Sequence, residues 1–229
     1  MCLSAWHGNL LLGGVGILLS EVREEIVQVC RRLFAAGLMP GTSGNVSVRV
    51  GDHIAVTPSG LDYTEMTADL VGVHRLDGTP VAAPLAPTSE MPLHLAVYAS
   101  TRTSAIVHTH STAATVLSTL VDELPPIHYM VALFEGPVRV TPYATYGTPE
   151  LAENAVGALR GSAACILGNH GTVTIGPDLR TAQSRNEYLE WVSDLYLRAA
   201  SVGRSRLLDT EEIKRVAEKL SGYGQTRPS

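Results

Sequence analysis

Two histidines, His108 and His110, have the residue type and spacing that point most directly to chemistry. They follow the apolar run at residues 105–107, which is typical of a buried strand. Side chains at i and i+2 of a strand project from the same face, so the two imidazoles could share one metal ion. Paired histidines also occur as hydrogen-bonded structural residues, and the pair alone leaves both interpretations open.

His170 is the third candidate ligand. It lies in Gly168-Asn169-His170-Gly171, a pattern that predicts a turn between two strands, and the flanking glycines leave the backbone free to aim the ring. Three histidines with an open fourth position are typical of catalytic zinc sites. The alternative is an ordinary turn histidine exposed to water.

Glu90 is the candidate acid or base. In Pro87-Thr88-Ser89-Glu90 it falls in the first turn of a predicted helix, where the helix dipole favours an ionised carboxylate. Beside a divalent cation, such a group either ligates the metal or moves a proton, as carbon-acid chemistry requires. Acidic residues are also common in first helical turns because of the dipole alone.

Three short segments of small and hydroxyl-bearing residues have the composition of an anion site. They are residues 41–45 (GTSGN), residues 57–60 (TPSG) and the pair Thr88-Ser89. Each offers backbone N–H groups that can surround an anion. Any one of them is most simply an ordinary turn, but three of them upstream of a possible metal triad predict a small phosphorylated substrate held by neutral donors.

Composition limits the class of protein. The chain has 229 residues, 45% of them hydrophobic, and a net charge of −5, which predicts one soluble globular domain and argues against nucleic-acid or membrane partners. Three scattered cysteines favour a reducing, cytoplasmic compartment. Because no basic residue precedes the apolar residues 10–19, we expect a loose leader at 1–17 and not a signal peptide, with the domain at 18–223 and a tail at 224–229.

Hydrophobic periodicity predicts alternating strands and helices in a single α/β domain. Helices are expected from Ser20 to Gly37, from Ser89 to residue 100, over 112–120, from Pro149, over 179–203 and from 210, with Ser20 and Ser89 as N-caps. Strands are expected at residues 46–50, 53–57, 71–74, 105–109, 163–167 and 173–175, with a turn at residues 77–78.

In their order along the chain, the motifs GTSGNVS, TPSG, PTSE, HTH, IHYM, PYATYGT and NHG resemble the class II aldolase/adducin family over residues 20–223. The resemblance implies a single three-layer α/β/α domain with a largely antiparallel central sheet. It implies a cyclic homotetramer with sites between subunits. It also implies a zinc-dependent aldolase that cleaves L-fuculose 1-phosphate, or a related deoxy-pentulose 1-phosphate, to dihydroxyacetone phosphate and an aldehyde.

The same resemblance assigns roles to individual residues. Zinc is expected at His108, His110 and His170, with Glu90 as a movable fourth ligand and proton carrier. Tyr129 is expected to reach the neighbouring subunit's site as a proton donor, and Tyr223 to close over the substrate. The expected phosphate-binding residues are Thr42, Gly44, Asn45, Ser59, Gly60, Thr88 and Ser89.

Other functions share parts of this pattern. Sugar-phosphate 4-epimerases of the family typically have an aspartate where this chain has Tyr129, which favours the aldolase. Methylthioribulose-1-phosphate dehydratases share the zinc triad and stay open as an alternative. A non-catalytic adducin-like scaffold has no need of the three histidines and Glu90. A metal-free binding protein would leave the same polar residues unexplained by packing.

Overall fold

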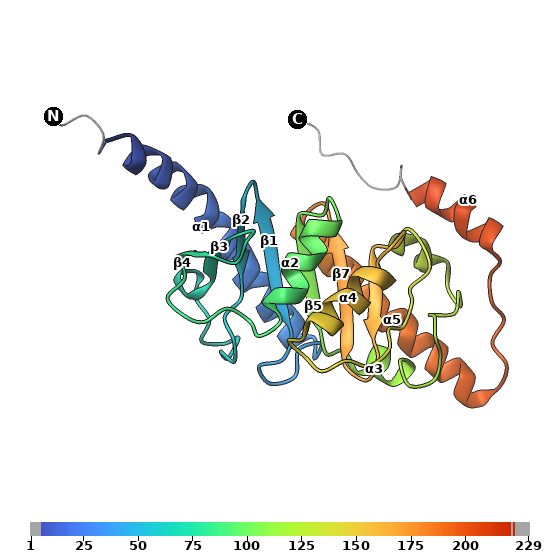
Figure 1. Ribbon diagram of the computed structural model, residues 1–229. Coiled ribbons are helices and arrows are strands. Elements are labelled where there is room, and N and C mark those ends of the chain that lie inside the picture. The colour runs from blue at the N-terminus through green and yellow to red at the C-terminus, as the bar shows by residue number, and fades with distance from the viewer. Residues whose placement is uncertain (1–5, 221, 223–229) are drawn as a thin grey trace.

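The centre of the fold is a seven-stranded sheet with the order β4-β3-β2-β1-β5-β7-β6 (Figure 1). The structure is a computed structural model that describes residues 6–220 and 222, with side chains from residue 19 onward. All pairings between neighbouring strands are antiparallel, which confirms the sheet that the resemblance implies. The strands are β1 Asn45–Val50, β2 His53–Val56, β3 Gly72–Arg75, β4 Pro80–Ala82, β5 Ala105–Thr109, β6 Ala164–Leu167 and β7 Gly171–Gly176.

Helices cover both faces of the sheet and complete the predicted three layers (Figure 1). One apolar core joins α2 and α4 to the sheet, and another joins α1 and α5 to its opposite face. The helices are α1 Trp6–Ala35, α2 Met91–Ser100, α3 Thr112–Leu117, α4 Pro149–Ala158, α5 Leu179–Val202 and α6 Thr210–Leu220, with 3-10 helices η1 Ala68–Leu70 and η2 Tyr129–Phe134.

Alternation along β5 fixes which side chains reach which layer. Ala105 and Val107 belong to the core under α1 and α5, whereas Ile106 belongs to the core under α2 and α4. His108 is therefore directed toward α2, because side chains at i and i+2 share a face. A shift of the β5 pairing by one residue would move each of its side chains to the opposite face of the sheet. Because both faces are buried, such a shift is unfavourable and the register is fixed.

The start of the chain differs from the prediction. Helix α1 begins at Trp6 and runs through Ser20, so the predicted N-cap at Ser20 is wrong. The segment before Ser20 is rich in leucine, which favours helix, and has no proline to stop it. Residues 6–17 are helical, and the division into a leader at 1–17, a domain at 18–223 and a tail at 224–229 stays a prediction.

Smaller differences concern element ends. Glu90, and not Ser89, is the N-cap residue of α2, without a side-chain capping bond. Helix α3 ends at Leu117, earlier than predicted. The short strand β4 and both 3-10 helices were not predicted, because segments this short carry too little periodicity.

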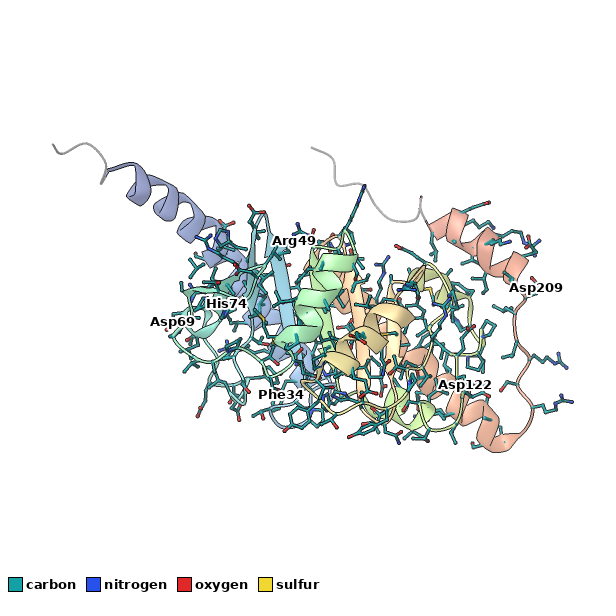
Figure 2. The ribbon with its side chains drawn as sticks, viewed as in Figure 1. Phe34, Arg49, Asp69, His74, Asp122 and Asp209 are labelled. Carbon is teal, nitrogen blue, oxygen red and sulfur yellow. The ribbon has the colours of Figure 1, made fainter. Side chains whose placement is uncertain are left out.

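Charged side chains such as Asp69, Asp122 and Asp209 lie at the periphery (Figure 2). Within residues 6–220 and 222, no helix has both the length and the apolar character needed to cross a membrane.

Candidate active site

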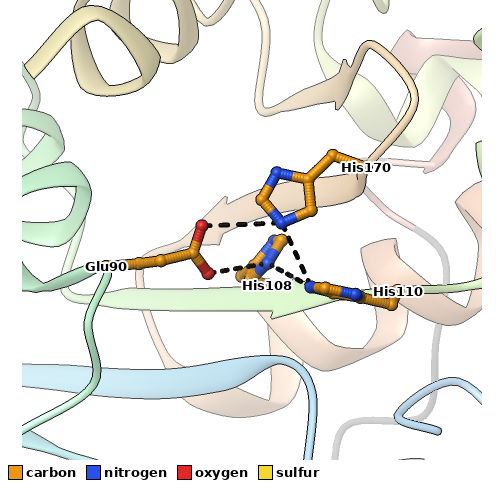
Figure 3. A group of neighbouring side chains, drawn as sticks. All are labelled: Glu90, His108, His110 and His170. Carbon is orange, nitrogen blue, oxygen red and sulfur yellow. Dashed lines mark hydrogen bonds and ion pairs between the residues drawn. The ribbon is translucent and has the colours of Figure 1, made fainter. Parts of the chain in front are cut away.

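Four of the predicted residues meet at one edge of the sheet (Figure 3). His108 is the next-to-last residue of β5, His110 directly follows that strand, His170 lies in the turn between β6 and β7, and Glu90 is the N-cap residue of α2. The Nε2 atom of His110 lies 3.1 Å from Nε2 of His108 and 3.1 Å from Nε2 of His170. Glu90 Oε2 is 2.9 Å from His108 Nε2. The structure therefore brings together the four residues that the sequence predicted as metal ligands.

Strand register brings these distant residues together. In the antiparallel sheet, β5 lies between β1 and β7, so the end of β5 adjoins the beginnings of both neighbours. Asn45 pairs with His108 and Thr109 pairs with Thr172. Close contact at this edge requires glycine: a Cβ atom on Gly171 would lie 2.1 Å from the Thr109 carbonyl oxygen.

Hydrogen bonding directs the His108 ring. Its Nδ1–H donates to the carbonyl oxygen of Thr172 at 2.9 Å, which leaves Nε2 facing the cluster. Burial, reinforced by the neighbouring histidines, lowers the pKa of His110 to about 3. Burial and His108 lower the pKa of His170 to about 4. Both imidazoles are therefore neutral at pH 7, which is the form that binds metals.

Glu90 is buried, with 4% of its surface exposed. Burial raises the pKa of Glu90, but the attraction of His108, hydrogen bonds from His108 and Asn45, and the nearby His170 outweigh burial and hold this pKa well below its usual range. Among the described residues, Glu90 Oε1 has no hydrogen-bond partner. Oε1 lies 3.6 Å from His170 Nε2, which is beyond hydrogen-bond distance. A buried carboxylate oxygen that accepts no hydrogen bond is costly, and a cation at this position would satisfy it.

The cluster fits a divalent metal on its own geometry. The four ligand atoms all lie within 4.8 Å of one another. Two nitrogens bound to tetrahedral zinc at roughly 2.0–2.1 Å are separated by about 3.3 Å, close to the 3.1 Å between the imidazole nitrogens here. Three imidazoles and one carboxylate also form a common ligand set for zinc.

A cavity of about 410 Å³ opens beside the cluster. Glu90, His110 and His170 line one part of it. None of the described residues that line the cavity is a lysine or arginine. The remaining lining residues include every predicted phosphate-binding residue, namely Thr42, Gly44, Asn45, Ser59, Gly60, Thr88 and Ser89.

Tyr129, one of the two predicted tyrosines, does not line this cavity. Tyr129 lies in η2 and is 47% exposed, with its ring against His128 at a centroid distance of 4.4 Å. Tyr223 lies outside the described residues. Sequence reasoning instead missed Tyr143 and Tyr146, which are exposed and line the cavity, although both belong to the PYATYGT motif.

The sequence analysis also did not single out His94, a buried residue that lies behind Glu90 and contacts Asn45. Asn45 donates from Nδ2 to Glu90 Oε2 at 2.9 Å, and its Oδ1 lies 2.5 Å from His94 Nε2. His94 is fully buried within α2. The available signal was its spacing, because residues 90 and 94 share one face of a helix.

Known proteins share both the fold and the motifs. The profile of the Class II Aldolase and Adducin N-terminal domain matches residues 24–197. The chain is 37% identical to 5-deoxy-D-ribulose 1-phosphate aldolase of Bacillus thuringiensis serovar kurstaki, over 91% of this chain and 100% of that protein. It is 34% identical to L-fuculose phosphate aldolase of Escherichia coli strain K12, over 90% of this chain and 96% of that protein.

A solved structure of L-fuculose 1-phosphate aldolase superposes with a TM-score of 0.85 at 37% identity, covering 88% of this chain and 96% of that one. The fold and the histidine cluster thus define an α/β enzyme of the aldehyde-lyase class. The chain belongs to the class II aldolase/adducin family. Class II aldolases use a divalent metal, and the Glu90 cluster has the donor set to hold one.

Proposed function

We propose that this protein is a zinc-dependent aldolase that reversibly cleaves a ketose 1-phosphate to dihydroxyacetone phosphate and an aldehyde. The substrates we propose are L-fuculose 1-phosphate and related deoxy-pentulose 1-phosphates, such as the 5-deoxyribulose 1-phosphate in the name of one relative. One observation carries the proposal: three imidazole nitrogens and a buried carboxylate border the same cavity as the neutral donor loops.

The donor loops hold the substrate phosphate in this proposal. Hydroxyl groups of Ser59, Thr88 and Ser89 and the backbone near Gly44 and Gly60 border the cavity. Such donors bind an anion without a cationic side chain. Thr42 and Asn45 complete the set. Asn45 has two amide hydrogens. It donates one to Glu90, which leaves the other for the phosphate.

His108, His110 and His170 hold the metal, with Glu90 as a movable fourth ligand. A divalent metal there supplies positive charge that stabilises the carbanion formed beside the substrate carbonyl when the carbon–carbon bond breaks. Glu90 then returns or removes the proton at that carbon. No lysine is required, and Lys214 and Lys219, the only two in the sequence, both lie in α6.

Neighbouring subunits complete the site in a cyclic homotetramer. Tyr129 exchanges a proton with the aldehyde oxygen in the adjacent subunit's site, and Tyr223 closes over the substrate. The exposure of Tyr129 and its absence from the lining of its own cavity support this role. Cys30 and Cys165 are buried free thiols, which supports a reducing, cytoplasmic compartment.

Incubating the zinc-loaded protein with a panel of ketose 1-phosphates and identifying the products by mass tests this function. We expect dihydroxyacetone phosphate and one aldehyde from at least one deoxy sugar. Loss of water without carbon–carbon cleavage would identify a dehydratase. An isomer of unchanged mass, separated by chromatography, would identify an epimerase; either result overturns the aldolase proposal.

A further inference from the structure

Helix α2 and strand β1 place a row of polar side chains behind the active site. Glu90, His94 and Tyr98 are spaced four residues apart, so they lie along one face of the helix. Asn45 and Ser47 are two residues apart on β1 and therefore share the face toward α2. All five side chains are buried, in the middle of packing that is otherwise apolar.

Hydrogen bonds join the five side chains into one chain. Tyr98 OH lies 2.8 Å from Ser47 Oγ, and Ser47 Oγ lies 2.6 Å from His94 Nδ1. His94 Nε2 lies 2.5 Å from Asn45 Oδ1, and Asn45 Nδ2 lies 2.9 Å from Glu90 Oε2. The chain runs from the apolar interior to the carboxylate at the cavity.

The ionised carboxylate of Glu90 determines every proton position in the chain. It accepts from the Asn45 Nδ2–H, so Asn45 Oδ1 faces His94 and must accept from Nε2–H. Burial lowers the pKa of His94 to about 3, so the ring carries a single proton and its Nδ1 is an acceptor. Ser47 therefore donates to Nδ1, and the Tyr98 hydroxyl donates to Ser47.

We propose that His94 is a positioning residue, which acts through the Asn45 amide to hold the Glu90 carboxylate in the orientation required for proton transfer. This inference rests on the proposed role of Glu90 as the proton carrier. The Asn45 donor would matter most with metal bound, because His108 Nε2 would then be a metal ligand and carry no proton. Asn45 is then the sole donor to Glu90 among the contacts of the described residues.

Ser47 and Tyr98 act one step further back by selecting the His94 tautomer. With the proton on Nδ1, His94 Nε2 would become an acceptor and draw the Asn45 amide nitrogen toward itself. The Asn45 oxygen would then face the Glu90 carboxylate and repel it. A neutral chain of hydrogen bonds thus keeps the charged group in place without adding a second buried charge.

The proton position can be measured directly in the zinc-loaded wild-type protein. Nitrogen NMR of protein with 15N-labelled histidine distinguishes a protonated from an unprotonated ring nitrogen. We expect His94 to carry its proton on Nε2 and to have a bare Nδ1. A proton on Nδ1, or on both nitrogens at pH 7, would overturn the proposed chain whatever reaction the enzyme catalyses.

Two His94 variants test the positioning role. His94→Leu removes the donor to Asn45, whereas His94→Gln keeps a donor and an acceptor. We expect His94→Leu to slow hydrogen exchange at C3 of dihydroxyacetone phosphate by roughly 10–100-fold, with KM changed by less than about threefold, and His94→Gln to restore most of the rate. Cobalt affinity, measured by chelator competition, should fall in the same order.

The Ser47→Ala substitution is smaller. It removes only the hydroxyl group that donates to His94 Nδ1 and so selects the His94 tautomer. We expect it to fold, to shift part of the His94 population to the Nδ1–H form, and to slow exchange less than His94→Leu. Folded His94→Leu protein with wild-type exchange and cobalt affinity would overturn the inference. Wild-type exchange in Glu90→Gln would instead refute the proposed role of Glu90 as proton carrier and leave the NMR result to decide the hydrogen-bond chain.

Discussion

At the scale of single residues, the sequence identifies the candidate ligand side chains, whereas only the fold shows which neighbours a side chain such as Asn45 contacts. The residue types alone left structural interpretations open for His108, His110, His170 and Glu90, and the resemblance of their motifs to the class II aldolase/adducin family favoured the metal site. Asn45 was predicted as a phosphate donor, yet its side chain contacts Glu90 and His94. That direction depends on the pairing of Asn45 with His108 across β1 and β5, which one sequence does not disclose.

Glu90→Gln tests the proton-transfer role. The substitution keeps the side-chain shape and an acceptor oxygen for Asn45 but removes the base. We expect hydrogen exchange at C3 of dihydroxyacetone phosphate, followed by NMR, to fall by about 10²–10⁴-fold. Glu153→Gln, on the exposed surface of α4, is the matched control and should exchange at the wild-type rate. Equal rates in the two variants would remove Glu90 from catalysis.

At the scale of elements, periodicity predicted the long segments and missed the short ones. Strand β5 and helix α5 have strong apolar patterns and were predicted nearly at their observed ends. Strand β4 has only three residues, all exposed, so it offered no pattern. The direction of the strands came from the family resemblance, because alternation along a strand does not reveal its neighbours.

Close contact between β5 and β7 predicts that Gly171→Ala disrupts the site. The new Cβ atom would lie 2.1 Å from the backbone oxygen of Thr109, and neither strand can yield as a flexible side chain would. We expect a loss of about 1–3 kcal/mol in the free energy of unfolding. Metal affinity should fall as well, because the shift separates His110 from His170.

Gly157→Ala is the matched control for that experiment. Gly157 lies in α4, and a Cβ atom there would meet nothing within 4 Å. We expect a gain of about 0.5–1 kcal/mol in the free energy of unfolding and unchanged metal affinity. Urea unfolding followed by circular dichroism measures both variants; an unchanged free energy of unfolding for Gly171→Ala would contradict the close-contact argument.

At the scale of the whole molecule, the site depends on contacts between segments far apart in the sequence. Residues 45, 90, 108 and 170 meet because β1, β5 and β7 are adjacent and α2 packs on the face they share. The two cores on opposite faces of the sheet hold this arrangement before any ligand binds. Sequence motifs identified the residues, but only the strand order explains why they converge.

This convergence predicts that metal binding stabilises the whole fold. Three separate segments of the chain, at Glu90, at residues 108–110 and at His170, supply the four ligand groups, and the unfolded chain cannot hold them together. Free metal at 100 times its dissociation constant should add about 2.7 kcal/mol to the free energy of unfolding, which corresponds to a rise in Tm of roughly 5–10 °C for a domain of this size. Calorimetry with and without a chelator measures this difference.

The variants His170→Ala and His53→Ala distinguish stabilisation by metal at the proposed site from a general effect of the chelator on Tm. His53 lies in β2 and belongs to a different surface hollow, so the His53→Ala protein should keep the full metal-dependent rise in Tm. His170→Ala removes one of three imidazole ligands, and we expect its Tm to be nearly the same with metal and with chelator. A full metal-dependent rise in Tm for His170→Ala would place the metal elsewhere, because the proposed site has lost one of its three imidazole ligands in this variant.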